Sequence, residues 1–133
     1  MALTNAKISL KTRIGIDDPE EFYELLEIYN KYPLEELIIH PRVLKEYYKG
    51  IPHWEIFDYA VKNSKNPLCY NGDIFSVEDF ERFQQEVLQK NDNHHVHAIM
   101  LGRGILQNPA LIEQLVRFSL SKLHQKKPHP NRV

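Results

Sequence analysis

The sequence predicts an α/β fold in which four strands alternate with helices and form one parallel sheet. Four short apolar runs each end in a polar residue or a glycine, and these end residues follow one another at intervals of 29, 31 and 31 residues. They are Lys11, His40, Asn71 and Gly102. A strand, a helix of ten to fifteen residues and two loops together occupy about 30 residues, so this spacing is typical of consecutive βα units.

The alternation of side chains within each run supports the same fold. If the four end residues point to one side of the sheet, the other side receives only apolar or aromatic residues, as a face covered by helices requires. These outward residues are Ile8, Leu10, Leu37, Ile39, Leu68, Tyr70, Ile99 and Leu101. The inward residues are smaller and more mixed, namely Ser9, Ile38, Cys69, Ala98 and Met100. Folds of this kind place their ligand sites at the carboxyl ends of the strands.

The first two connections between strands differ in the residues that begin, interrupt and end their predicted helices. In the first, Asp17 or Asp18 can cap a helix that has Pro19 at its first position and ends at Pro33. The second connection is interrupted. It contains a turn or short helix over Pro41–Tyr48, then a Gly-Ile-Pro break, then a helix from about Trp54 to Ser64. An interrupted crossover indicates that the loop above the strand has a function.

The second half of the chain contains two further predicted helices. Ser76 and Asp79 form an approximate capping box that opens a helix continuing to Val87. A polar loop over Asn91–His97 precedes the fourth strand, and a last helix runs from about Pro109 to Leu123. We therefore expect one domain over residues 1–124 and a flexible tail over residues 125–133.

Composition limits the classes of protein that fit. The 133 residues, 42% of them hydrophobic, suffice for one domain with one core. The formal net charge of -1 gives no overall attraction to nucleic acid, so a polyanion would require a local basic patch. No apolar stretch approaches the ~20 residues of a membrane span. Cys69 is the single cysteine, which excludes an internal disulfide and predicts a buried thiol in a reducing cytoplasm.

Glycine-bearing turns follow the last two predicted strands and are the first candidates for a ligand site. Glycines let the backbone approach an anion closely, and an arginine beside them favours phosphate. Gly102-Arg103-Gly104 has this pattern, with a simple turn as the alternative, and Asn71-Gly72-Asp73 repeats it one strand earlier.

Charged and aromatic side chains near the other strand ends extend the candidate site. Lys11 is an inward cation that either pairs with an anionic or polar ligand or reaches solvent. His40 is a strand-end imidazole, with Arg42 two residues later. Trp54, Tyr47 and Tyr48 either stack on nucleic-acid bases or belong to the core. The histidines at 94, 95 and 97 lack cysteine or acidic partners at a metal-binding spacing, so we expect no metal site.

Taken together, four ordered motifs strongly resemble those of the tRNA-dihydrouridine synthases. They are Lys11-Thr12-Arg13-Ile14-Gly15, His40-Pro41-Arg42, Tyr70-Asn71-Gly72-Asp73, and Met100-Leu101-Gly102-Arg103-Gly104 with Asn108-Pro109. The resemblance covers about Ile8 to Leu115. Members of this family are FMN-dependent TIM-barrel enzymes that use NADPH to reduce uridine in tRNA.

The resemblance implies a role for each motif. Lys11 and His40 would contact the flavin ring of FMN, and Arg42 would face the tRNA. The ribityl chain and phosphate would be held by Asn71, Gly72, Asp73, Gly102 and Arg103.

The resemblance also implies that the chain corresponds to half of the family's catalytic domain. A TIM barrel has eight strands and typically about 250 residues, so we expect a half TIM barrel of four βα units that matches strands 5–8. The family's first half, with the cysteine that protonates the uracil ring, has no counterpart, and Cys69 lies within a strand. We therefore expect no catalytic residue here, a chain inactive alone, and either an N-terminal half-barrel or a second copy as partner.

Two other classes of protein remain open at this point. One is a non-catalytic phosphate- or nucleotide-binding α/β module. The other is a different flavin barrel, such as a dihydroorotate dehydrogenase-like oxidoreductase. The His-Pro-Arg motif and the aromatic, basic crossover after it favour the tRNA enzyme over the second of these.

Overall fold

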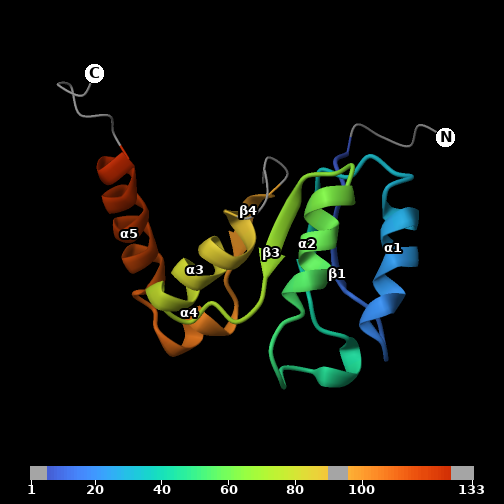
Figure 1. The fold of residues 1–133 in the computed structure, drawn as a ribbon, viewed down its shortest axis with the longest axis horizontal. Helices are drawn as coiled ribbons and strands as arrows, with labels where there is room; N and C mark the ends of the chain where they lie inside the picture. The colour runs from blue at the N-terminus through green and yellow to red at the C-terminus, as the bar shows by residue number, and fades with distance from the viewer. Residues whose placement is uncertain (1–5, 90–95, 127–133) are drawn as a thin grey trace.

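The computed structural model describes residues 6–89 and 96–126, and within them four parallel strands form one sheet. The strands are β1 (Ser9–Arg13), β2 (Glu36–His40), β3 (Leu68–Asn71) and β4 (Val96–Met100), in the order β1-β2-β3-β4 (Figure 1). Neighbours in the sheet are thus also neighbours in the chain, each pair joined by a helical connection. This confirms the predicted α/β fold with its parallel sheet.

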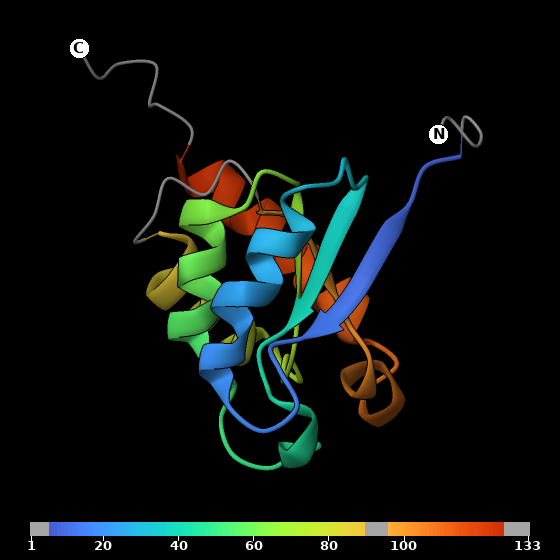
Figure 2. The same cartoon turned by 90° about the vertical axis from the view of Figure 1, so that its right-hand side faces the viewer.

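Five α-helices and three shorter helical turns connect and follow these strands in the described residues. The α-helices are α1 (Phe22–Tyr29), α2 (Trp54–Asn63), α3 (Val77–Phe83), α4 (Arg103–Gln107) and α5 (Leu111–Lys126). The turns are 3-10 helices at Pro19–Glu21 and Leu44–Glu46 and a π-helical turn at Gln84–Leu88. Figure 2 shows α1 and α2 side by side on one face of β1 and β2. None of the described helices is long and apolar enough to span a bilayer.

The core lies between the sheet and these helices. Strand residues Leu37, Ile39, Leu68 and Tyr70 are fully buried, as the alternation predicts. The Tyr70 ring stacks on Phe83 of α3 with 4.0 Å between centroids, and its hydroxyl accepts a hydrogen bond of 2.9 Å from Trp54 Nε1. Burial of each such side chain contributes about 1.5–3 kcal/mol to stability. Ile8 departs from the prediction, since it precedes β1 and is 62% exposed.

The observed register of the sheet shows where the predicted strand ends differ from those in the structure. Lys11 lies in the middle of β1 and pairs with Ile38, because the strand continues to Arg13, which pairs with His40. Val96 and His97, expected in a loop, belong to β4. His40 ends β2 as predicted, so the imidazole and Arg13 meet at the carboxyl edge of the sheet.

Capping residues set the helix starts as expected, whereas the helix ends differ. Asp18 accepts a hydrogen bond from the Glu20 amide, and Ser76 accepts one from the Asp79 amide, which confirms both caps. The helix opened by Asp18 ends at Tyr29, before Pro33. Helix α4 was not predicted, because a helix of five residues leaves no periodic pattern. The last helix reaches Lys126, beyond the domain boundary expected at residue 124. Residues 127–133 of the expected tail lie outside the described residues.

Candidate functional site

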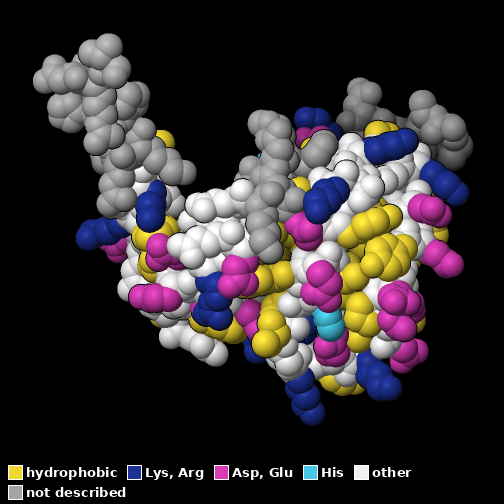
Figure 3. Space-filling view, viewed as in Figure 1, with side chains coloured by type: hydrophobic (Ala, Val, Ile, Leu, Met, Phe, Trp, Pro, Cys, Tyr) yellow, Lys and Arg dark blue, Asp and Glu magenta, His cyan; other side chains and the backbone are white. Residues whose placement is uncertain are grey.

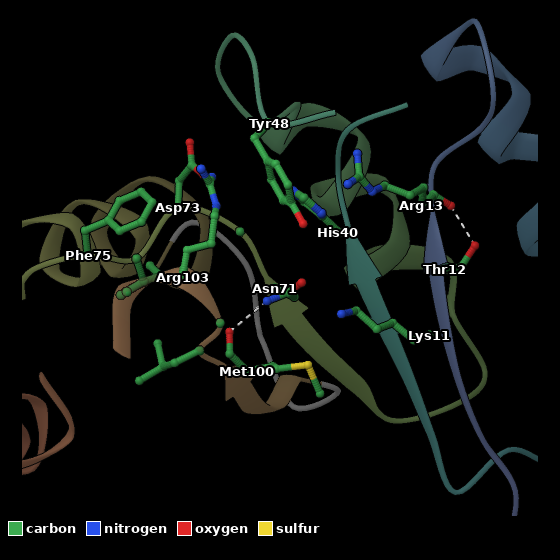
Figure 4. A pocket seen from close by; sticks show the side chains of 15 residues that line it. Lys11, Thr12, Arg13, His40, Tyr48, Asn71, Asp73, Phe75, Met100 and Arg103 are labelled. Carbon is green, nitrogen blue, oxygen red and sulfur yellow. Dashed lines mark hydrogen bonds and ion pairs between the residues drawn. The ribbon is translucent and has the colours of Figure 1, made fainter. Parts of the chain in front are cut away.

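A pocket of about 360 Å³ lies at the carboxyl ends of the strands (Figure 4). Its wall is made by the end of β1, the end of β2 and the segments that follow β2, β3 and β4. It includes seven of the eight binding residues expected from the sequence, namely Lys11, His40, Asn71, Gly72, Asp73, Gly102 and Arg103. The eighth, Arg42, does not line the pocket.

The pocket combines unpaired and tightly paired polar groups. Lys11 is exposed rather than buried, and among the described residues its ammonium group has no hydrogen-bond or ion-pair partner. The Asn71 amide nitrogen donates to the Met100 carbonyl at 3.0 Å and so joins the ends of β3 and β4. Among the described residues, and apart from Gly102 and its two neighbours in the chain, no heavy atom lies within 4 Å of the position that a Cβ at Gly102 would occupy. The backbone there is open to a ligand.

Arg42 is the most tightly held side chain near the pocket. It is fully buried, and each of its five N–H groups has a partner. The partners are both carboxylate oxygens of Asp73 (2.9 and 2.5 Å), the Lys49 carbonyl (3.0 Å), the Gly50 carbonyl (2.5 Å) and His40 Nε2 (3.3 Å). The hydrogen bonds with Asp73 raise the pKa of Arg42 above its ordinary value. In contrast to the expectation that Arg42 faces the tRNA, the guanidinium has no donor left for another molecule.

Asp73 joins this buried arginine to a second one at the rim of the pocket. Its Oδ1 also accepts a hydrogen bond of 3.0 Å from Arg103. Burial would raise the pKa of the carboxyl group, but the hydrogen bonds and charge of Arg42, with the charge of Arg103, hold it below its ordinary value. The turn that places Asp73 has a φ of +152° at Gly72, which favours glycine. Asp73 is therefore an ionised acceptor that two arginines already share.

Arg103 is held by aromatic rings as well as by Asp73. Its guanidinium carbon lies 4.0 Å from the centre of the Tyr48 ring and 5.2 Å from that of Phe75. Such cation–π contacts fix a guanidinium while leaving its edge free for hydrogen bonds. The side chain is 39% exposed, so the cation is accessible from the pocket.

Tyr48 and Phe75 also line the pocket; Tyr48 was left open between base stacking and the core, and Phe75 was not predicted. Tyr48 is 54% exposed and stacks on His40 with 6.1 Å between centroids, so it belongs to the pocket rather than to the core. The loop that bears it is held from β1, where Arg13 Nη1 donates to the Tyr47 carbonyl at 2.7 Å and to the Val43 carbonyl at 3.3 Å. The interrupted second connection was the sequence signal for this loop. Trp54, in contrast, packs against the core.

His40 is uncharged at neutral pH. Burial, followed by the positive charges of Arg13 and Arg42, lowers the pKa of its imidazole to about 4. The residue is only 5% exposed. An imidazole in this state can donate one hydrogen bond and accept another, but it cannot serve as a cation.

Cys69 and the histidine cluster supply no reactive or metal-binding group in the described residues. Burial raises the pKa of the Cys69 thiol to about 11, in agreement with its predicted place inside a strand. No group of three or more His, Cys, Asp or Glu residues in the described ranges is arranged to hold a metal ion. His97 instead pairs with Glu36 at 2.7 Å, and the histidines at 94 and 95 lie outside the described residues.

The remaining surface is less specific than this pocket. On the face seen in Figure 3, Lys and Arg side chains are scattered among Asp and Glu side chains. A second, open and mainly apolar hollow lies between α3, β4 and α5. We call it the α3–α5 groove, and its lining includes Phe80, Leu88, Ile99, Leu115 and Leu120.

Comparisons with known proteins agree with the motifs around the pocket. The family model described as Dihydrouridine synthase (Dus) matches residues 2–132. A probable tRNA-dihydrouridine synthase of Staphylococcus epidermidis is 30% identical over 115 residues, which are 86% of this chain and 35% of the relative. The tRNA-dihydrouridine(16) synthase of Pseudomonas putida is 33% identical over 107 residues, 80% of this chain and 31% of the relative. The chain thus spans about a third of the length of these relatives.

Proposed function

Because this chain belongs to the dihydrouridine synthase family, we propose that it forms the FMN-binding part of an enzyme that reduces uridine in tRNA to dihydrouridine with NADPH. The observation that supports this most strongly is the pocket itself. Residues from four motifs that are about 30 positions apart in the sequence lie around one hollow at the carboxyl ends of the strands. Sites at this edge of a parallel sheet are the rule in βα folds.

We further propose that the four βα units are half of a TIM barrel and correspond to its strands 5–8. Within the described residues, β1 and β4 are the two edges of an open sheet. The relatives are about three times as long as the matched segment, enough for further βα units. An N-terminal half-barrel would pair with both edges and close the pocket from the side that β1 and β4 leave open.

The groups in the pocket fit FMN, which has a flat ring, a polyol chain and a phosphate. The phosphate requires cations and backbone approach, which the accessible Arg103 and the open backbone at Gly102 provide. The polyol chain requires hydrogen-bonding groups, such as Asn71 beside Gly72. The unpaired ammonium of Lys11 suits the oxygen- and nitrogen-rich edge of the ring, with His40 nearby.

Each residue then has a task that its surroundings support. When bound, FMN supplies the hydride transfer between NADPH and the uracil ring. Lys11 places a positive charge where negative charge on a bound ring would be stabilised. Arg103 binds the phosphate. Asp73, which we expected to contact the cofactor, instead holds Arg103 in place, and Arg42 supports Asp73 from inside the protein.

A comparison of two flavins tests the proposal. Arg103→Ala removes a charge-assisted contact worth roughly 1.5–3 kcal/mol, so the Kd for FMN should rise about tenfold to a hundredfold in a fluorescence titration. Riboflavin has no phosphate, and its Kd should barely change. The matched control is Arg82→Ala, because Arg82 forms an exposed ion pair with Asp79 and lies outside the pocket lining. Equal losses for both flavins would assign Arg103 to folding and contradict its role at the phosphate.

We also propose that these 133 residues make no dihydrouridine by themselves. Reduction of the uracil ring requires a proton at the neighbouring carbon, and a positioned general acid contributes a factor of about 10²–10⁴. Cys69 is buried in β3 and lines neither the pocket nor the α3–α5 groove. An assay of dihydrouridine on unmodified tRNA with FMN and NADPH checks this, alone and with a relative's N-terminal half added. Activity of the chain alone that disappears in Cys69→Ala would contradict it.

A further inference from the structure

The two ring nitrogens of His40 have different surroundings, and Arg42 is the cause. We propose that Arg42 fixes the tautomer of His40, so that the imidazole meets a ligand in the pocket as a hydrogen-bond donor through Nδ1. The identity of that ligand rests on the proposed function. The tautomer is a property of the protein alone.

The geometry at Nε2 leaves one assignment. Arg42 Nη1 lies 3.3 Å from His40 Nε2. A guanidinium nitrogen only donates hydrogen bonds, so Nε2 must accept with its lone pair. A neutral imidazole that accepts at Nε2 carries its hydrogen on Nδ1.

Arg42 has no freedom to release this contact. Asp73 holds the same guanidinium with both carboxylate oxygens, and the Lys49 and Gly50 carbonyls take two further N–H groups. The side chain is fully buried, so water cannot replace a lost partner. A rotation of the guanidinium away from His40 would leave a charged donor unpaired in the interior. The free-energy penalty of that unpaired donor is larger than the stabilisation from the hydrogen bond with His40.

The charges that face His40, together with its burial, keep the ring neutral near neutral pH. Arg13 and Lys11 from β1 and Arg42 beyond β2 all oppose a positive imidazole, and only Asp73 from the β3–α3 loop favours one. The Tyr48 ring stacks on the imidazole. His40 is therefore a donor of fixed direction rather than a proton-transfer group.

The donor is free to act on a ligand. No group in the described residues accepts a hydrogen bond from Nδ1, although His40 is only 5% exposed. Every side-chain nitrogen or oxygen that is fully shielded from solvent in the described ranges has a partner. Nδ1 must therefore be accessible, and the space that His40 borders is the pocket. A carbonyl oxygen or unprotonated ring nitrogen of a flat heteroaromatic ligand is the matching acceptor.

The direct test is a long-range nitrogen–proton NMR spectrum of the ligand-free protein with labelled histidine, recorded from about pH 3 to 8. The chain has seven histidines, and His40→Gln identifies the signals of His40 by their loss. At neutral pH we expect the hydrogen on Nδ1, and for His40 a lower titration midpoint than for the other histidines in the described residues. A hydrogen on Nε2 at neutral pH, or a midpoint near 6.5, would overturn the inference.

Two variants distinguish the effect of the hydrogen bond from Arg42 on the tautomer from the effect of the surrounding positive charges on the pKa of His40. Arg13→Gln should raise the titration midpoint of His40 and leave the tautomer unchanged. Arg42→Met should raise the midpoint and also allow the tautomer with the hydrogen on Nε2. An unchanged tautomer in folded Arg42→Met would contradict the role of Arg42, and if that variant does not fold, the wild-type spectrum with Arg13→Gln decides. Because no flavin is present, failure of FMN binding would leave this result untouched.

Discussion

Replacement of Arg42 by methionine should destabilise the protein strongly, although methionine fills a similar volume. The change removes all five hydrogen bonds of a fully buried guanidinium. Loss of one partner of a buried ion pair typically costs 3–5 kcal/mol. In Arg42→Met, Asp73 would still pair with Arg103, and its side chain is 28% exposed. We therefore expect a loss at the lower end of this range, about 3 kcal/mol. That is a large part of the ~5–15 kcal/mol by which domains are stable.

Urea unfolding measures this loss. With a typical slope of about 1–3 kcal/mol per molar urea, 3 kcal/mol lowers the midpoint by roughly 1–3 M. Arg82→Met is the matched control, since its ion pair with Asp79 is exposed and worth about 1 kcal/mol or less. A midpoint for Arg42→Met no lower than that of the control would refute the view that Arg42 is a structural clamp.

The pH dependence of the free energy of unfolding tests the pairing of Arg42 with Asp73 independently. The pKa of Asp73 is lowered from its ordinary 3.8, so its contribution is present above that pH and is lost as the pH falls through the lower, folded-state value. The stability difference between wild type and Arg42→Met should therefore be constant at neutral pH and should narrow in acid below about pH 4. A difference that grows on acidification would contradict the pairing with Asp73.

Three further outcomes follow from the same structure. Gly104→Ala should lower the free energy of unfolding by about 1–3 kcal/mol, measured by thermal unfolding. A Cβ at this position would collide with the Ile74 carbonyl and lie 2.9 Å from Leu111. Gly102→Ala should lower it less, because a Cβ there meets no such neighbour among the described residues. The Cys69 thiol, with its pKa raised to about 11 by burial, should react with a disulfide reagent at pH 8 at least about tenfold more slowly in native than in urea-unfolded protein, and equal rates would contradict its burial. Light scattering should show self-association through the open edges β1 and β4, and a stable monomer at tens of micromolar would count against the half-barrel.

The strands and their faces could be predicted because their signals are local. Two-residue alternation marks Leu37, Ile39, Leu68 and Tyr70 as one face, and all four are buried against the helices. The spacing of the strand ends then places their polar residues at one edge. For this reason the sequence led to seven residues of the pocket.

The role of Arg42 could not be predicted, since it depends on two loops that fold toward each other. Its position after His40 resembles that of an exposed strand-end residue. The burial arises only when the Lys49–Gly50 segment and Asp73, 31 residues away, close around the guanidinium. Tyr48 was assigned ambiguously for the same reason, because its ring reaches the pocket through a loop held by Arg13 and Arg42.

Mapping of FMN onto the protein by NMR tests the central claim most directly. In a titration of the labelled protein, we expect the largest amide shift changes at the carboxyl ends of the strands, around Lys11, Gly72 and Gly102. Riboflavin should reproduce the changes near Lys11 and omit those near Gly102. Changes confined to the α3–α5 groove, or none at saturating FMN, would contradict the account of this pocket as a flavin site.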